Sequence, residues 1–495
     1  MLQVKELSQA SGLEVYETSL AEAGKVTYFL GRKGAEKLVG AVGPTGNIKI
    51  KGAKAGKVGR AQVIVAPTDH ANARIIRLAL SWTAPRCLGL ATSVGLGDRL
   101  GLATPGHVRA VRGTSLTPVF AQQSIREMTR TQRTPDEVMD CATWGVLQEG
   151  FAAGFGSDAD HLQKLEDIDY TLASGFTMFT IDPGAHVDNQ ADVDEPAVLG
   201  KKMAALDFQT LGTSVQDLWS RYVGKRFDLD RTAVFFDEQR LLRAAAKYGN
   251  AVAHTVRMFR HLQDSARGEF ELEVSVDETA TPTSPAEHYF FANELKRLGV
   301  RWVSMAPRFI GRFEKGVDYI GDVDAFAASF AEHVAVMKAL GPYKISMHSG
   351  SDKFSIYPVV ARLAGPYVHL KTAGTSYLEA LRALATIDPG LFRRILDFAH
   401  QRYETDKASY HVSANPAKAP HGADLKDKEL AGVLEGFDGR QLLHVTFGSV
   451  LTARNADGAS TFKEAILAAL KKDEQRHYEV LARHLGRHVA PFAGG

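Results

Sequence analysis

Cysteine is almost absent from this chain, in which only Cys87 and Cys141 occur among 495 residues. Neither belongs to a CxxC pair, so the sequence contains no recognisable thiolate zinc site and too few cysteines for a disulfide framework. Each cysteine borders an apolar segment. We therefore expect two buried, reduced thiols in a cytosolic protein.

Long hydrophobic runs and an excess of one charge are also missing. No stretch approaches the roughly 18 consecutive apolar residues of a membrane-spanning helix. The N-terminus, MLQVKELSQA, lacks the basic and apolar segments of a signal peptide. The 59 basic and 57 acidic residues give a formal charge of only +2, which excludes an obvious nucleic-acid or membrane partner. We expect a soluble, cytoplasmic and unprocessed protein.

Short apolar runs alternate with amphipathic helical stretches from Cys87 onward, at intervals typical of βα units. There are eight such runs, and eight strands with intervening helices are the pattern of a (β/α)8 TIM-type barrel. The 45% hydrophobic content is sufficient for its core. The runs are Leu88–Val94, Thr117–Ala121, Gly154–Ala159, Phe176–Ile181, Phe270–Val276, Trp302–Phe309, Tyr343–Met347 and Tyr367–Thr372.

The segments around these runs have a different character. Residues 1–85 contain short strand-like runs and a Gly/Lys-rich stretch, which predict an N-terminal α/β extension. Residues 86–390 form the predicted barrel, with a long helical insertion near 184–268, after strand four. Residues 391–495 predict a helical C-terminal extension. A long insertion on the functional face of a barrel is typical of a lid or a subunit contact, which leaves a homo-oligomer open.

Two helix starts have recognisable signals. Thr134 is suited to cap a helix after the second strand, because Pro135 fits the first helical position and Glu137 completes a capping box. Thr104–Pro105 predicts a second start of the same kind.

Histidines follow two of the predicted strands at the end where barrels carry their chemistry. Asp160 and His161 are neighbours in GSDADH, and His348 lies in KISMHSGSD. A single histidine at such a place is more often a hydrogen-bonded structural residue than a ligand. Two of them at one barrel mouth, beside a carboxylate, favour a metal enzyme in which the imidazoles hold the cation and the carboxylate moves a proton.

The fifth strand carries a row of polar residues. Alternation in ELEVSVDE places Glu271, Glu273, Ser275 and Asp277 on one face. Acidic side chains are costly on a dry face and reasonable in a polar barrel mouth that binds a metal. Carboxylates and imidazoles without thiols suit a divalent metal cation such as zinc, manganese, cobalt, nickel or iron, among which the sequence does not choose.

Two cationic residues have two interpretations each. The first strand ends in GLGDRLG, whose spacing differs from the GxGxxG dinucleotide loop, so the glycines indicate a tight turn. Arg99 in this turn is either an anchor for a substrate carboxylate or a surface arginine. Lys371 on the eighth strand either pairs with an anionic substrate or bridges to a neighbouring carboxylate.

Longer motifs resemble the tagaturonate–fructuronate epimerase family of hexuronate catabolism. The resemblance implies a carbohydrate isomerase whose partner is a small sugar acid, with no nucleic acid or membrane involved. The motifs span roughly residues 95 to 385 and continue in the C-terminal part: GDRLGLATPGHVRA, FAQQSIRE, CATWGVLQEGF, GSDADHLQ, GFTMFTIDP, EVSVDETATPTSP, FIGRFEKGVDY, KISMHSGSDKFSIYP, HLKTAGTSYLEALR, SYHVSAN and LLHVTFGSVL.

A more distant resemblance is to metal-dependent class II aldolases, whose third strand ends in Asp-His and whose seventh ends in His. It implies that Asp160 transfers protons and that His161 and His348 are metal ligands. It also implies that Glu273 is the opposing acid/base. Those aldolases take a third ligand, a histidine, from the loop after strand six. The corresponding residue here is Glu314, whose carboxylate is a suitable substitute.

The reaction chemistry agrees with this resemblance. The two keto acids differ at the carbon β to the ketone, which deprotonation next to the carbonyl cannot invert. Retro-aldol cleavage and re-addition can invert it, and the enediolate that forms calls for a Lewis acid. The same residues would serve a tagatose/fructose 4-epimerase or a class II-type aldolase. A non-catalytic protein that binds sugar acids is a further alternative, against which the clustered carboxylates argue.

Overall fold

Eight parallel strands close into a barrel in the computed structural model, which describes residues 3–230 and 232–493. The pairing order is β7, β8, β9, β10, β13, β14, β15, β16 and back to β7. Every strand overlaps one of the eight predicted runs, which confirms the (β/α)8 fold. The strands are β7 (Ser93–Gly95), β8 (Thr117–Ser124), β9 (Gly156–Leu162), β10 (Met178–Ile181), β13 (Glu271–Val276), β14 (Ser304–Pro307), β15 (Lys344–Met347) and β16 (Val368–Lys371).

Local signals explain where the first barrel helices begin. Helix α5 (Pro135–Glu149) starts with the predicted capping box between Thr134 and Glu137. Helix α3 (Thr104–Val111) differs from the prediction, because Thr104 is its first residue and no side chain caps it. The backbone N–H of Ala103 instead donates to Asp98 Oδ2 at 2.7 Å.

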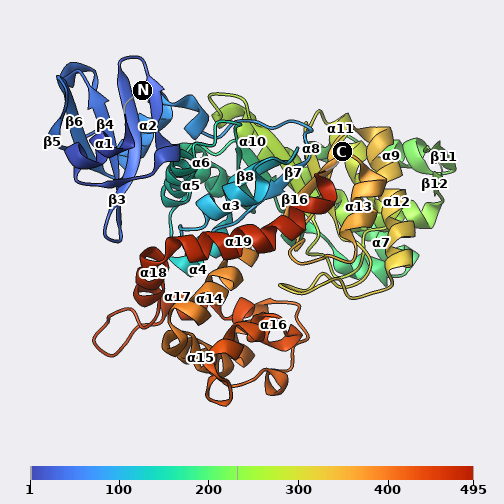
Figure 1. Cartoon of the computed structure of the whole chain (residues 1–495). Coiled ribbons are helices and arrows are strands. Elements are labelled where there is room, and N and C mark those ends of the chain that lie inside the picture. Colours follow the sequence, from blue (N-terminus) through green and yellow to red (C-terminus); the bar gives the residue numbers. More distant parts are fainter. Residues whose placement is uncertain (1–2, 231, 494–495) are drawn as a thin grey trace.

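The first part of the chain forms an antiparallel sheet beside the barrel (Figure 1). Its strands are β1 (Glu14–Val15), β2 (Ala21–Ala23), β3 (Val26–Lys33), β4 (Glu36–Gly43), β5 (Ala53–Val58) and β6 (Ala61–Pro67), with helices α1 (Val4–Ser11) and α2 (His70–Ala79). Val39 of β4 and Ile76 of α2 share one hydrophobic cluster with Trp144 and Leu147 of α5. This cluster fastens the sheet to the barrel's outer layer.

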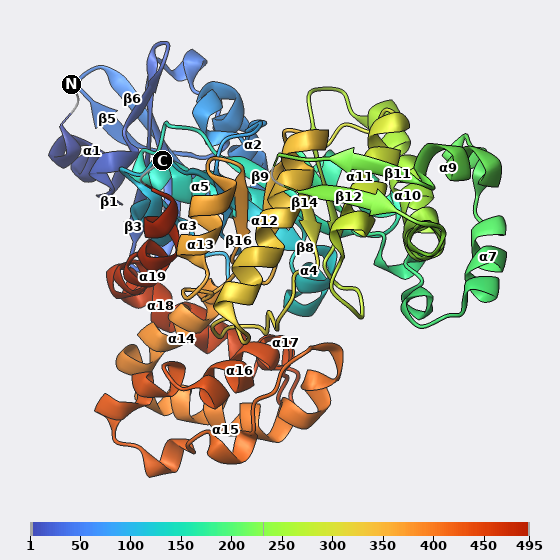
Figure 2. The same ribbon diagram turned by 90° about the vertical axis from the view of Figure 1, so that its right-hand side faces the viewer.

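The insertion follows β10 and lies on the side of the barrel away from the N-terminal sheet (Figure 2). It contains α7 (Pro196–Ala204), α8 (Phe208–Leu211), α9 (Val215–Tyr222) and a hairpin that the helical pattern had not indicated, β11 (Lys225–Asp228) and β12 (Ala233–Phe236). The long α10 (Glu238–Ser265) then leads back to β13. The remaining barrel helices are α4 (Ile125–Thr131), α6 (Leu165–Ala173), α11 (Pro285–Arg297), α12 (Val323–Leu340), α13 (Tyr357–Ala364) and α14 (Thr375–Ile387).

Helices make up the last part of the chain. They are α15 (Pro389–Asp406), α16 (Phe437–Val445), α17 (Phe447–Thr452), α18 (Lys463–Lys472) and α19 (Glu474–Val489). Helix α19 returns across the barrel and packs against α3 and α14, as Figure 1 shows in red. The loop before α16 and α16 itself lie next to the loop that follows β14, because Ser413 donates to Glu314 at 2.8 Å and Arg440 donates to the Gly316 carbonyl at 2.6 Å.

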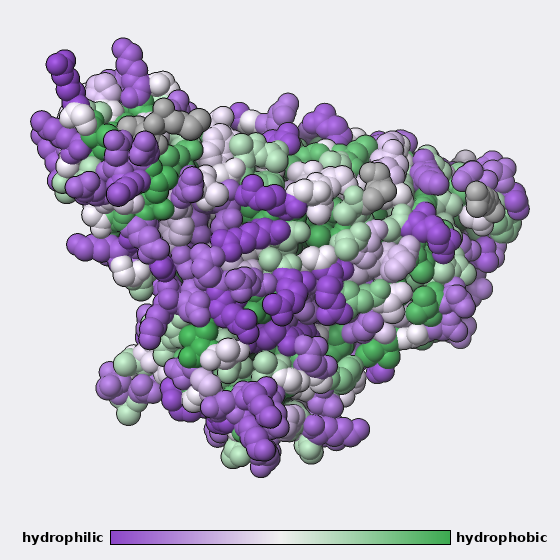
Figure 3. Space-filling model, in the orientation of Figure 1, coloured by the Kyte–Doolittle hydropathy of each residue, from purple (hydrophilic) through white to green (hydrophobic). Residues whose placement is uncertain are grey.

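One face of the molecule is largely hydrophilic (Figure 3), and both cysteines are free. Hydrophilic side chains cover most of the face shown in Figure 3, with hydrophobic residues scattered among them. Among the described helices, none has the length and apolar character to cross a bilayer. Both cysteines are free, but each is partly exposed instead of buried. Cys87 lies in the loop before β7, and Cys141 borders a cavity beside α5.

Candidate functional site

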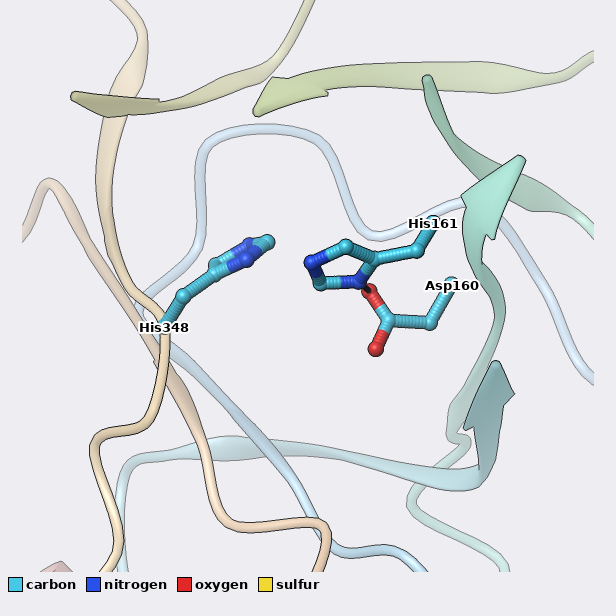
Figure 4. A group of neighbouring side chains, drawn as sticks. All are labelled: Asp160, His161 and His348. Atoms are coloured by element: carbon cyan, nitrogen blue, oxygen red, sulfur yellow. Dashed lines mark ion pairs between the residues drawn. The ribbon is translucent and has the colours of Figure 1, made fainter. Parts of the chain in front are cut away.

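Asp160 and His161, at the end of β9, both face the barrel mouth (Figure 4). Consecutive strand residues normally point to opposite faces. The His161 side chain nevertheless lies on the same side as that of Asp160, because the φ of His161 is +53° and the register between β9 and β10 shifts at this point. A left-handed non-glycine residue costs about 1–3 kcal/mol and is typical of functional sites. Ser349, directly after His348, is also left-handed, with φ of +48°.

His348 comes from the far side of the mouth, at the end of β15, and faces His161 (Figure 4). The two ring centroids are 5.0 Å apart. Asp160, His161 and His348 each offer a ligand atom, and these atoms lie within 4.8 Å of one another. Glu273 Oε1 lies 2.6 Å from His348 Nε2, so the structure brings together four of the five residues that the sequence proposed.

Asp277, just beyond β13, completes this group, although the sequence had noted it only as part of the acidic row. Its Oδ1 lies 3.3 Å from His348 Nδ1 and 3.7 Å from His161 Nε2. Two ligands of one divalent metal, with bonds of about 2.0–2.2 Å, lie roughly 3.0–3.6 Å apart. His161 Nε2 is buried, and it has no hydrogen-bond partner among the residues that the structure describes. The donor set therefore fits a divalent cation.

Each histidine also contacts a carboxylate through its other ring nitrogen. His161 Nδ1 lies 2.9 Å from Asp160 Oδ1, and His348 Nε2 lies 2.6 Å from Glu273 Oε1. Such carboxylate–histidine pairs orient the ring and leave the second nitrogen free for a metal. Glu273 is fully buried below His348 and does not line the cavity at the mouth.

Lys371, at the end of β16, forms the floor of the site. Its Nζ lies 2.8 Å from Asp158, 2.6 Å from Asp160 and 2.7 Å from Glu273. Of the two interpretations, the structure thus shows the bridge to neighbouring carboxylates. These three carboxylates outweigh burial and hold the pKa of the Lys371 ammonium well above its usual range.

The floor carboxylates ionise differently. Burial raises the pKa of Asp158 to about 6, although Lys371 counteracts it. Burial acts on Asp160 in the same direction, but His161 and Lys371 outweigh it and hold the pKa of Asp160 well below its usual range. A base that stays ionised next to a cation site can accept a proton from a substrate hydroxyl.

Glu314, the residue predicted as third ligand, is held by hydrogen bonds from the C-terminal part of the chain. Its Oε2 accepts hydrogen bonds from the Ser413 backbone N–H at 2.9 Å, from Ser413 Oγ at 2.8 Å and from Gln441 Nε2 at 2.9 Å. It lines a cavity of about 270 Å³ that Asp277 and His348 also line, and its hydrogen bonds join the loop after β14 to the C-terminal part of the chain. Asp277 occupies the position beside the histidines instead, because it follows β13 directly.

Arg99 is not a surface residue. It is buried, and its Nη2 lies 2.7 Å from Glu127 Oε1 while its guanidinium stacks at 3.6 Å on the Phe447 ring. Arg99 and the histidines line one cavity of about 60 Å³.

Comparisons with known proteins agree with this geometry. The family model of tagaturonate epimerase matches residues 16–492. A tagaturonate/fructuronate epimerase of Thermotoga maritima is 41% identical over 483 residues, which cover 98% of each chain. Crystal structures of a fructuronate–tagaturonate epimerase from Cohnella laeviribosi, one native and two with glycerol, match with a TM-score of 0.92 and 36% identity. They cover 99% of this chain and 98% of that one.

Proposed function

Because the chain belongs to the tagaturonate epimerase family and is an isomerase, we propose that it interconverts D-tagaturonate and D-fructuronate by metal-dependent retro-aldol cleavage and re-addition. The observation that carries the metal dependence is the position of Asp277 Oδ1, which lies 3.7 Å from His161 Nε2 and 3.3 Å from His348 Nδ1. The buried His161 nitrogen without a partner supports it.

The proposed ligands are His161, His348 and Asp277, with Asp160 and Glu273 orienting the two imidazoles. A divalent cation bound there supplies Lewis acidity that stabilises negative charge on substrate oxygens as the carbon–carbon bond breaks. Two imidazoles and one carboxylate suit zinc, manganese, cobalt, nickel or iron. The nearby Lys371 offsets part of the charge of the three floor carboxylates, so the acidic residues do not repel an anionic substrate as strongly as their number indicates.

Asp160 is the proposed proton-transfer residue. In the ketose, C2 carries the ketone and C4 is the centre that inverts. Asp160 accepts the proton of the C4 hydroxyl while the electron pair of the C3–C4 bond moves into the enediolate. The aldehyde then turns its other face, the C3–C4 bond forms again and the proton returns to the C4 oxygen. Asp160 suits this role because it lines the cavity and stays ionised beside His161 and Lys371.

Glu273 has a different proposed role from the opposing acid/base that the aldolase resemblance implied. It is fully buried and contacts His348 and Lys371. We assign Glu273 as a positioning residue: it orients His348 and acts on the substrate only through that histidine.

Chelation and metal add-back test the proposal. The protein treated with a chelator should lose turnover of both keto acids, and one of the five metals should restore it. Asp277→Asn should bind less metal, as measured by elemental analysis. The neighbouring Glu278→Gln, which removes a half-exposed partner of Arg126 at 3.0 Å, is the matched control and should retain its metal. Full turnover in thoroughly demetallated protein would refute metal dependence.

The assay also separates the proposal from the aldolase and 4-epimerase alternatives. Fructuronate, tagaturonate, fructose and tagatose are supplied side by side. An aldolase releases two three-carbon fragments, whereas the proposed epimerase yields only the second six-carbon keto acid. Faster turnover of the neutral sugars than of the acids would favour the ketohexose epimerase.

A further inference from the structure

One wall of the cavity at the barrel mouth is cationic. Arg99 from the loop after β7, Lys315 from the loop after β14 and His444 of α16 line the same cavity as Asp160 and the histidines. We call these three residues the cationic wall. Glu127 pairs with Arg99 and compensates part of its charge. Of the other cations lining the cavity, Arg126 is already paired with Glu278 at 3.0 Å, and Lys371 is paired with the floor carboxylates at 2.6–2.8 Å.

Each member of the cationic wall has a donor that the protein leaves without a full set of partners. Arg99 contacts Glu127 through Nε and Nη2, while its buried Nη1 has no partner in the described part of the chain. His444 Nδ1 is likewise buried, and none of the described residues hydrogen-bonds with it. Lys315 Nζ donates to Ser349 Oγ at 2.6 Å, and among the described residues no carboxylate pairs with it. Buried donors without partners are costly unless a ligand satisfies them.

Two glycines shape this wall. A Cβ on Gly374 would lie 2.0 Å from His444 Cε1, and one on Gly316 would lie 3.3 Å from His444 Nδ1. Gly374 precedes the first residue of α14, and both glycines line the cavity. The N-terminus of this helix of 13 residues adds partial positive charge beside the wall.

We infer that the cationic wall binds the carboxylate of the sugar acid, with Arg99 Nη1, Lys315 Nζ and His444 Nδ1 as donors. This inference rests on the proposed function and names the feature that selects acids over neutral ketohexoses. Burial and the neighbouring Arg99 and Lys315 hold the pKa of His444 well below its usual range, so it contributes a neutral N–H.

The anchor also explains how an epimerase avoids losing its fragments. Cleavage of C3–C4 places the carboxylate, C6, on the aldehyde fragment, 2-hydroxy-3-oxopropanoate. With C6 held by the cationic wall, rotation about C4–C5 presents the second face of the aldehyde while the fragment stays in the cavity. The bound carboxylate therefore holds the aldehyde fragment in the cavity during the inversion. Weaker contacts between the carboxylate and the cationic wall should convert part of the epimerisation into net cleavage.

Lys315→Met and Arg99→Lys test the anchor. Each removes donors, and Arg99→Lys keeps a cation beside Glu127. We expect kcat/KM for D-fructuronate to fall about 10- to 150-fold, the effect of losing a charged hydrogen bond, while kcat/KM for D-fructose changes little. Dihydroxyacetone should appear during turnover of the acid. Arg109→Lys is the matched control, because Arg109 also pairs with a glutamate, Glu149, and stacks on a ring, that of Tyr478, away from this cavity.

Binding gives a second readout that does not depend on turnover. D-gluconate, which has a carboxylate but no ketone, should bind the metal-loaded protein more tightly than D-glucitol, and Lys315→Met should remove that difference. Equal losses for fructuronate and fructose, or an unchanged preference for gluconate in both variants, would overturn the inference. If the wild-type protein turns over neither keto acid, the proposed function fails, while the gluconate measurement still decides whether the wall binds carboxylates.

Discussion

Replacing Lys371 by methionine should strongly destabilise the folded protein and make its stability depend on pH. The ammonium lies 2.6–2.8 Å from three carboxylates, and its side chain is only 4% exposed. Removing one partner of a buried ion pair costs about 3–5 kcal/mol, because the remaining charges stay desolvated. Proton uptake limits this cost, since the pKa of Asp158 is already about 6 with the lysine present.

The sign of the pH dependence follows from proton linkage. Without Lys371, the folded-state pKa of Asp158 rises further above its unfolded value, and the lowered pKa values of Asp160 and Glu273 rise as well. The folded variant therefore binds more protons than the folded wild type does. The penalty is therefore full at high pH and is relieved as pH falls through the raised folded-state pKa values. We expect the destabilisation at pH 6 to be about 1–3 kcal/mol smaller than at pH 8.

Urea unfolding of wild type and variant at both pH values, with a chelator present in all samples, measures this effect without a contribution from metal. Lys202→Met is the control. Lys202 also contacts two carboxylates, Asp188 at 2.6 Å and Asp194 at 2.5 Å, but its side chain is 29% exposed. Its loss should cost about 0–1 kcal/mol with little dependence on pH. A cost for Lys371→Met as small as that of the control would refute the reasoning.

Three other substitutions test the site and the fold. Asp160→Asn should retain metal while turnover falls about 10²- to 10⁴-fold, the usual contribution of a general acid/base; loss of metal and fold together would instead make Asp160 a structural or ligand residue. Glu273→Gln should lower metal affinity about 10- to 100-fold because His348 loses its orienting partner; unchanged affinity in a metal titration, combined with lost turnover, would return Glu273 to the acid/base role. Thr134→Ala should cost about 0.5–2 kcal/mol by removing the cap of α5, and a thermal or urea melt that matches wild type would show that the capping box contributes nothing.

Local patterns in the sequence were sufficient for the barrel and for part of the site. Strand and helix periodicity depend on neighbouring residues, so the eight strands and the cap of α5 could be predicted without knowledge of the packing. Because parallel strands in a barrel end at one mouth, the positions of Asp160, His161 and His348 at strand ends already indicated that they meet.

Tertiary structure decided the features that depend on contacts across the barrel. The left-handed backbone of His161 turns two consecutive residues to one side, which alternation alone does not predict. Asp277 and Glu314 are both acidic residues beyond strand ends, and only barrel closure places Asp277 beside the histidines and Glu314 against Ser413. His444 joins the cavity because α16 packs over the barrel mouth. The physical reason is that such contacts join residues far apart in the chain, and packing of the core, not any local pattern, brings them together.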